Sequence, residues 1–181
     1  MASTSSGATK EERLAADILE EFGITKEQLP VDVDAILAAK GFVVREEELP
    51  ESLAAVLDTR QEGKPVLLVD KNQDEKQLRF VKACELGHFL LDKDFRGVRT
   101  DKKSPLANIP SASYTDAHTL NAERFAYALL MPKTLLSEQV RDNADKSDDD
   151  LAGKLGTIFG VSAIAAVAGL VLYALFGGKE K

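Results

Sequence analysis

The stretch Cys84-Glu85-Leu86-Gly87-His88 combines three side chains that are able to do chemistry. Cys84 and His88 are four residues apart, so in a helix they share a face, and Glu85 reaches the same front from the flank. In zinc proteases with the pattern H-E-x-x-H, two such side chains hold the metal and the glutamate acts as general base on zinc-bound water. Zinc also accepts thiolate. Cys84 and His88 are therefore candidate metal ligands, and Glu85 is a candidate base.

The same five residues also have an ordinary structural interpretation. A cysteine in a helix is more often a small buried hydrophobic side chain. A lone histidine is more often hydrogen-bonded within a fold than bound to a metal. The stretch alone therefore leaves a metal site and a buried cysteine as alternatives.

The elements that would position these residues are predicted from apolar spacing and turn residues. Helices are expected over residues 11–22, 30–41, 77–91, 116–130 and 133–140, and strands over 42–49, 53–60 and 64–70. The last two strands form a β-hairpin, and Asp92 to Thr115 is expected to be a long polar loop. This order predicts an α+β fold in which a small β-sheet packs against helices.

Composition narrows the class of protein. The chain has 181 residues, 44% of them hydrophobic, and a net charge of -7, which fits a globular domain and disfavours direct binding to nucleic-acid phosphates. Cys84 is the single cysteine, so an internal disulfide is excluded. Together with the lack of a signal-peptide pattern, this predicts a cytoplasmic protein. Residues 1–10 are small and polar and are expected to form a disordered arm.

The wider sequence resembles the ImmA/IrrE family of metallopeptidases over about residues 14–170. That family carries R-F-x-x-A-H-E-L-G-H and then E-x-x-A-N-x-F-A-x-x-L-L-M-P. The chain matches the first block at Arg79, Phe80, Ala83, Glu85, Leu86, Gly87 and His88, and the second at Ala122, Phe125, Ala126, Leu129, Leu130, Met131 and Pro132. The resemblance implies a zincin-like active-site helix within a peptidase domain over residues 11–142.

The departures from the family pattern fall at the metal ligands. The family's first histidine is Cys84, its glutamate ligand is Thr119 and its Asn/Asp position is Glu123, so two of the three implied ligands are replaced. His88 and the implied base Glu85 are retained. Because His118 adjoins Thr119, Cys84, His88 and His118 would make a Cys/His₂ zinc set. The alternative for His118 is an exposed histidine at a helix start. Glu123 lies four residues after Thr119 and is able to approach the same space.

The resemblance implies two functions from different classes. The first is a zinc-dependent endopeptidase, with impaired catalysis, that acts on a protein such as a phage or mobile-element repressor. The second is a catalytically inactive protein-interaction module of the same fold. The replaced ligands favour the module, and the retained Glu85 favours the enzyme.

The C-terminal segment, residues 151–181, follows an acidic linker over 143–150. Residues 155–178 carry no charge and are long enough to cross a bilayer. Interrupting glycines and an N-cap at Ser162 also fit two helices with a turn around Gly160. A helix that is apolar all round must be buried in protein or lipid. The alternatives are a buried helix, a helix that forms a homodimer, and a membrane anchor.

Overall fold

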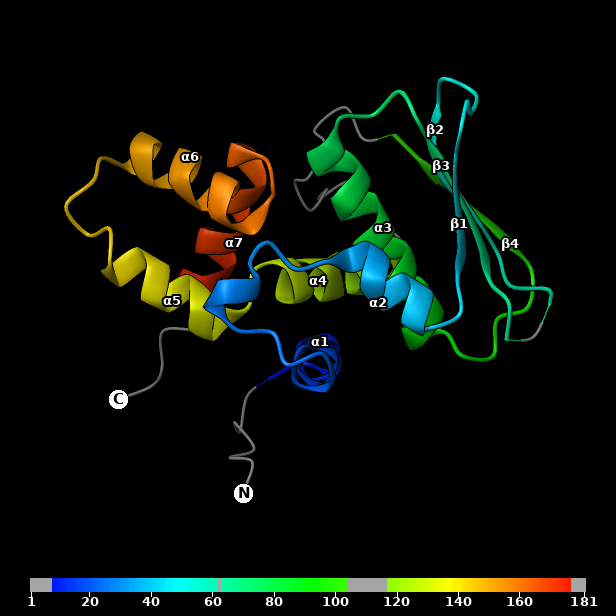
Figure 1. Ribbon diagram of the computed structural model, residues 1–181, viewed down its shortest axis with the longest axis horizontal. Coiled ribbons are helices and arrows are strands. Elements are labelled where there is room, and N and C mark those ends of the chain that lie inside the picture. The colour runs from blue at the N-terminus through cyan, green and yellow to red at the C-terminus, as the bar shows by residue number, and fades with distance from the viewer. Residues whose placement is uncertain (1–7, 62, 104–116, 177–181) are drawn as a thin grey trace.

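The computed structural model describes residues 8–61, 63–103 and 117–176, with side chains described up to residue 171. Within these ranges the chain forms seven α-helices, one short 3-10 helix and a four-stranded sheet (Figure 1). The helices are α1 (Lys10–Glu21), α2 (Val33–Ala39), α3 (Glu75–Leu91), α4 (Ala117–Leu130), α5 (Lys133–Arg141), α6 (Asp148–Phe159) and α7 (Ala163–Phe176), with η1 over Lys26–Gln28. The strands are β1 (Val43–Glu47), β2 (Leu53–Asp58), β3 (Val66–Asp70) and β4 (Val98–Lys102).

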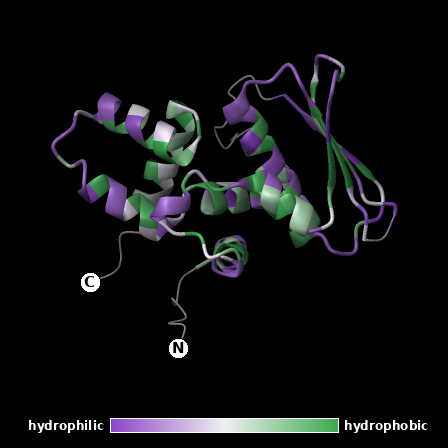
Figure 2. Ribbon diagram, in the orientation of Figure 1, coloured by the Kyte–Doolittle hydropathy of each residue, from purple (hydrophilic) through white to green (hydrophobic). Residues whose placement is uncertain are grey.

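The sheet confirms the predicted α+β class. Its strand order is β1-β3-β2-β4, with β1 parallel to β3 and with β2 antiparallel to both β3 and β4. The predicted hairpin is present as β2 and β3. Ala55, Leu57, Leu67 and Val69 alternate with half-buried residues along these two strands and join the hydrophobic core. Figure 2 shows that hydrophobic residues gather in the central strands and in α4, while the outer loops are hydrophilic.

Strand β4 corrects the expectation of a continuous loop from Asp92 to Thr115. Val98–Lys102 pairs with β2 in antiparallel register, from Asp58↔Val98 to Leu53↔Lys102. The strand is short, four of its five residues are charged or polar, and none of them is fully buried, so it lacks an apolar signal. Residues 104–115 of that predicted loop lie outside the described residues.

Helix α3 confirms the predicted helix over 77–91 and begins two residues earlier. Its start is fixed by a capping box, in which Asp74 accepts from the Gln77 backbone N–H and Gln77 reaches back to Asp74. The helix packs closely against α4. A Cβ built on Gly87 would lie 2.9 Å from Cδ1 of Phe125 and 3.1 Å from the carbonyl oxygen of Ala122. The absent side chain at Gly87 therefore lets the two helices that carry the candidate site approach each other.

Two basic side chains of α3 tie it to its neighbours. Lys82 is almost fully buried, and its Nζ lies 2.9 Å from a carboxylate oxygen of Asp34 and 3.3 Å from one of Glu46. Arg79 donates to the Val31 carbonyl at 2.6 Å and to the Gly160 carbonyl at 3.2 Å. Lys82 thus joins α3 to α2 and β1, and Arg79 joins it to the turn between α6 and α7.

The C-terminal segment forms two helices, α6 and α7, with a turn at Gly160, which was one of the two arrangements predicted from the sequence. Gly160 ends α6 in the left-handed conformation at φ 62°, and the Ser162 hydroxyl accepts from the Ala165 backbone N–H at 3.1 Å. Helix α6 begins at Asp148, inside the expected acidic linker. In the described part of the chain, no single helix has the length and apolarity needed to cross a membrane. The pair Asp148–Phe159 and Ala163–Val171 meets those two criteria together, but is bent by 102°.

Candidate functional site

Helix α3 places Cys84, Glu85 and His88 in the interior, between the sheet and α4. Glu85 is fully buried, and His88 and Cys84 are nearly so. The three side chains thus lie on the buried part of the same helix, as their spacing in the sequence predicted. Glu85 and His88 are polar groups inside a core, so their surroundings determine what they are able to do.

Strand β4 adds Asp101, which sequence reasoning missed. Its Oδ2 lies 3.7 Å from Nε2 of His88. Burial opposes ionisation of Asp101, but the neighbouring His88 imidazole outweighs this and lowers the pKa of Asp101. The sequence signal for strand β4 was weak. It consisted of the β-branched residues Val98 and Thr100, which alternate with charged residues after Gly97.

Glu85 and Asp101 form a carboxyl pair with unequal protonation. Burial, reinforced by the charge of Asp101, raises the pKa of Glu85 well above its usual value. Both Glu85 oxygens and His88 Nε2 are buried without a hydrogen-bond partner of good geometry among the described residues. The environment therefore favours a neutral Glu85 beside an ionised Asp101, because two close carboxylates resist a second negative charge.

Helix α4 contributes Glu123 to the same region, as its spacing from Thr119 allowed. One of its carboxyl oxygens is buried without a partner within the described structure. Burial, with a smaller contribution from the charge of Asp101, raises the pKa of Glu123 to about 7. Carboxyl groups from α3 and α4 thus lie within electrostatic reach of Asp101 on β4.

His118 is not brought into this group. It lies at the start of α4 with a 65% exposed side chain, and its Nδ1 is 4.0 Å from Oδ2 of Asp92, at the C-terminal end of α3. His118 and Thr119 are consecutive, so their side chains point about 100° apart around the helix axis, and adjacency in the sequence does not give them the same direction. The structure therefore places His118 as the alternative expected, an exposed histidine at a helix start.

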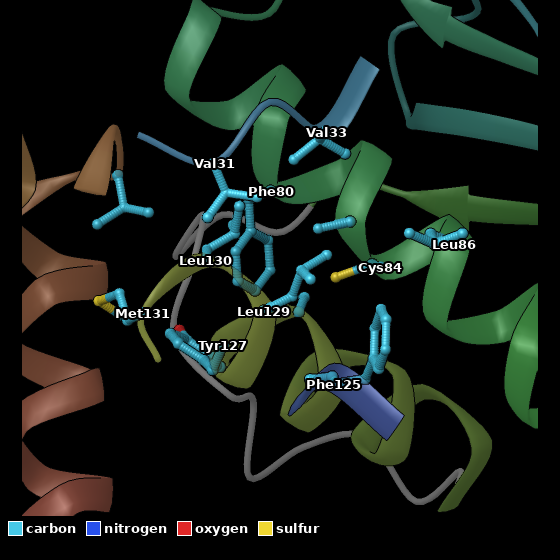
Figure 3. Close-up of a cluster of buried hydrophobic side chains, with 14 of the residues drawn as sticks. Val31, Val33, Phe80, Cys84, Leu86, Phe125, Tyr127, Leu129, Leu130 and Met131 are labelled. Carbon is cyan, nitrogen blue, oxygen red and sulfur yellow. The ribbon is translucent and has the colours of Figure 1, made fainter. Parts of the chain in front are cut away.

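Cys84 belongs to the hydrophobic core. Figure 3 shows its sulfur directed into a cluster that includes Phe80, Phe125 and Leu129. Burial raises the pKa of its thiol well above the usual value, and the negative charges of Glu123 and Asp101 raise it further. A zinc ligand must be the thiolate. The surroundings of Cys84 instead favour the neutral thiol of a small buried hydrophobic side chain.

The donor set does not fit the zinc that the resemblance implies. A catalytic zinc is held by three protein ligands. Over residues 8–61, 63–103 and 117–171, no three His, Cys, Asp or Glu side chains are grouped in a way that would hold a metal. Cys84, His88 and His118 therefore do not form the expected Cys/His₂ set, and Thr119 offers no carboxylate at the position of the third ligand.

Comparison with known proteins identifies the family in which Cys84 and Thr119 replace the expected metal ligands. The chain matches the family profile described as the IrrE N-terminal-like domain, a peptidase family, over residues 37–170, well over half of its length. No curated protein matches the chain. The matched range contains the sheet, α3 with Glu85 and His88, and α4 with Thr119. Members of this family typically depend on zinc, and Cys84 and Thr119 both lie within the matched range. The chain belongs to the ImmA/IrrE family and has its metallopeptidase-like fold.

Proposed function

We propose that this protein is a binding module built on the peptidase fold, which engages a protein partner without zinc-dependent cleavage. The observation that carries the proposal is the ligand set. His88 is retained, Cys84 packs in the apolar cluster, and Thr119 stands where the family pattern has a glutamate. A single imidazole does not provide the three ligands that a catalytic zinc requires.

The state of Glu85 supports the same proposal. A general base must be ionised and must lie beside a polarised water. Burial and the adjacent Asp101 raise the pKa of Glu85, which favours the neutral form. In this neutral form Glu85 has no free carboxylate to accept a proton, so we assign it the role of a buried polar group in α3.

The partner that we propose is a protein, such as a phage or mobile-element repressor, in keeping with the family resemblance. Strand β4 ends the described sheet and pairs with β2, so its outer edge offers backbone groups to an extended segment. Asp101 connects this strand to His88 of the site. The net charge of -7 and the lack of Lys or Arg in α7 argue against nucleic acid as the partner. A buried lone thiol fits action in the reducing cytoplasm.

A zinc-dependent endopeptidase is the second candidate function. The specific observation in its favour is that Glu85 and His88 remain together, buried, on the helix that the family uses for catalysis. This candidate requires two further ligands that the described residues do not group around His88.

Complementation with a Glu85→Gln variant separates the two functions. A host in which the gene is deleted receives either the wild type, Glu85→Gln, or the control Glu51→Gln, which changes an exposed carboxyl at the turn before β2. A binding module retains its cellular phenotype in Glu85→Gln, because the substitution keeps the shape of the side chain and removes only a base. Circular dichroism verifies that each variant is folded. Loss of the phenotype in a folded Glu85→Gln, with Glu51→Gln unchanged, would contradict the proposal.

A further inference from the structure

Helix α7 presents an aliphatic face to solvent. Ile164, Val167 and Val171 are 53%, 47% and 51% exposed, although each is a large hydrophobic residue. They are spaced i, i+3 and i+7, so they lie in one stripe along the helix. The opposite face, with Ala165, Ala166 and Gly169, is buried against the domain. The stripe is therefore a continuous apolar surface and not a set of scattered side chains.

The buried face of α7 packs closely against the side chain of Met131, which follows α4. A Cβ built on Gly169 would overlap the side chain of Met131 at the end of α4, with Sδ only 3.0 Å away. The turn before α7 is held as well, because Arg79 donates to the Gly160 carbonyl. In Figure 1, α7 lies beside α6 and near α5, at the side of the molecule away from the sheet. The face of α7 that carries Gly169 is thus directed inward, and the stripe on the opposite face is directed outward.

We propose that α7 is a homodimerisation helix, in which Ile164, Val167 and Val171 pack against the same three residues of a second copy of the chain. The spacing gives positions a, d and a of a heptad, the positions through which one helix packs its apolar stripe against another. A two-fold axis makes such a stripe complementary to itself, so one surface suffices for both copies. None of the 14 residues of α7 is charged, so the two stripes meet without like-charge repulsion despite the net charge of -7.

Charge and length favour a second copy over a lipid surface. Helices that bind at membrane interfaces carry Lys or Arg beside their apolar face, and α7 has neither. Fourteen helical residues span about 21 Å, short of the roughly 30 Å hydrocarbon core of a bilayer. The neighbouring start of α6 is acidic, with Asp148–Asp150, which disfavours contact with anionic lipid.

The size of the stripe predicts a reversible dimer. A helix about 21 Å long and about 10 Å wide covers on the order of a few hundred Å² on each copy. Stable interfaces bury about 800 Å² per partner, and smaller ones belong to weak or transient complexes. Dimerisation is therefore expected to depend on protein concentration, and it is independent of whether the site on α3 binds zinc.

Sedimentation velocity of the full-length chain over a range of concentrations tests this proposal. The wild type is expected to shift from the 19.6 kDa chain mass toward twice that mass as concentration rises. Val167→Glu, and separately Ile164→Gln, should remain at the monomer mass. Val98→Glu is the matched control, because Val98 is 46% exposed on β4 and the replacement is identical. Val98→Glu should dimerise as the wild type does.

Three results would overturn the proposal. The first is a wild type that remains monomeric at every concentration. The second is a folded Val167→Glu and a folded Ile164→Gln that both dimerise as strongly as the wild type. The third is a monomeric wild type that floats with phosphatidylcholine vesicles and loses this binding in Val167→Glu, which would make lipid the occupant of the stripe.

Discussion

Glu123→Gln is expected to stabilise the protein at alkaline pH and to leave its stability unchanged in acid. Burial and the charge of Asp101 raise the pKa of Glu123 from an ordinary 4.5 to about 7 in the folded state. Below about pH 4.5 the group is protonated in both the folded and unfolded states, so it contributes nothing. As the pH rises toward 7 the unfolded chain releases this proton first, and the wild type loses stability. Above about pH 7 the loss is constant.

The magnitude follows from the difference between the two pKa values. A carboxyl whose pKa rises from 4.5 to about 7 on folding lowers the free energy of unfolding by about 3.4 kcal/mol once it is ionised in both states. Glu123 is only partly buried, so solvent screening reduces this to about 1–2 kcal/mol. The variant should gain this amount at about pH 8, because glutamine fills the same space without a charge.

Urea unfolding followed by circular dichroism, at about pH 8 and about pH 4, measures the difference between wild type and variant. Glu51→Gln controls for the loss of one exposed negative charge and should show no such pH-dependent gain. A cation bound at the site would instead hold Glu123 as a carboxylate. The reasoning would be refuted if Glu123→Gln were less stable than the wild type at about pH 8.

Three further substitutions test the packing around the site by urea unfolding. Gly87→Ala should cost about 1–3 kcal/mol, because its new methyl group meets the backbone of α4; a stability equal to wild type would mean that the helices are free to separate. Arg79→Met should cost about 2–4 kcal/mol, since two part-buried hydrogen bonds to carbonyl groups lose their charged donor, and proteolysis should then reach the turn at Gly160 more readily. Cys84→Ser should be about 1–3 kcal/mol less stable than wild type and less stable than Cys84→Ala, because a hydroxyl in the apolar cluster lacks a partner; the reverse order would place Cys84 in a polar site.

The parts of the fold with strong local signals were predictable from the sequence. Helix α3 carries a capping pattern at Asp74 and a long apolar set, and the β2–β3 hairpin carries two apolar strands around a turn containing Gly63. The two C-terminal helices were one of two alternatives, and Gly160 and Ser162 are the residues that separate them. In each case local chemistry and tertiary packing agree.

The candidate site was less predictable, because it depends on contacts between distant segments. Glu85 and His88 could be placed by their spacing on one helix. Asp101 could not, since β4 is short and charged and takes its strand conformation from pairing with β2. The environment of Cys84 is set by Phe125 and other side chains of α4, which lie far away in the sequence. Whether a cysteine is a ligand or a core residue is decided by such contacts.

Zinc analysis of the purified full-length protein tests the central claim most directly. The wild type, after incubation with zinc and removal of the excess, is compared with the double variant Cys84→His/Thr119→Glu, which restores both replaced ligand positions beside His88. Mass spectrometry of the metal content should find zinc far below one ion per chain in the wild type and close to one in the double variant. One zinc ion per chain in the wild type, retained on dialysis, would contradict the account and favour the endopeptidase.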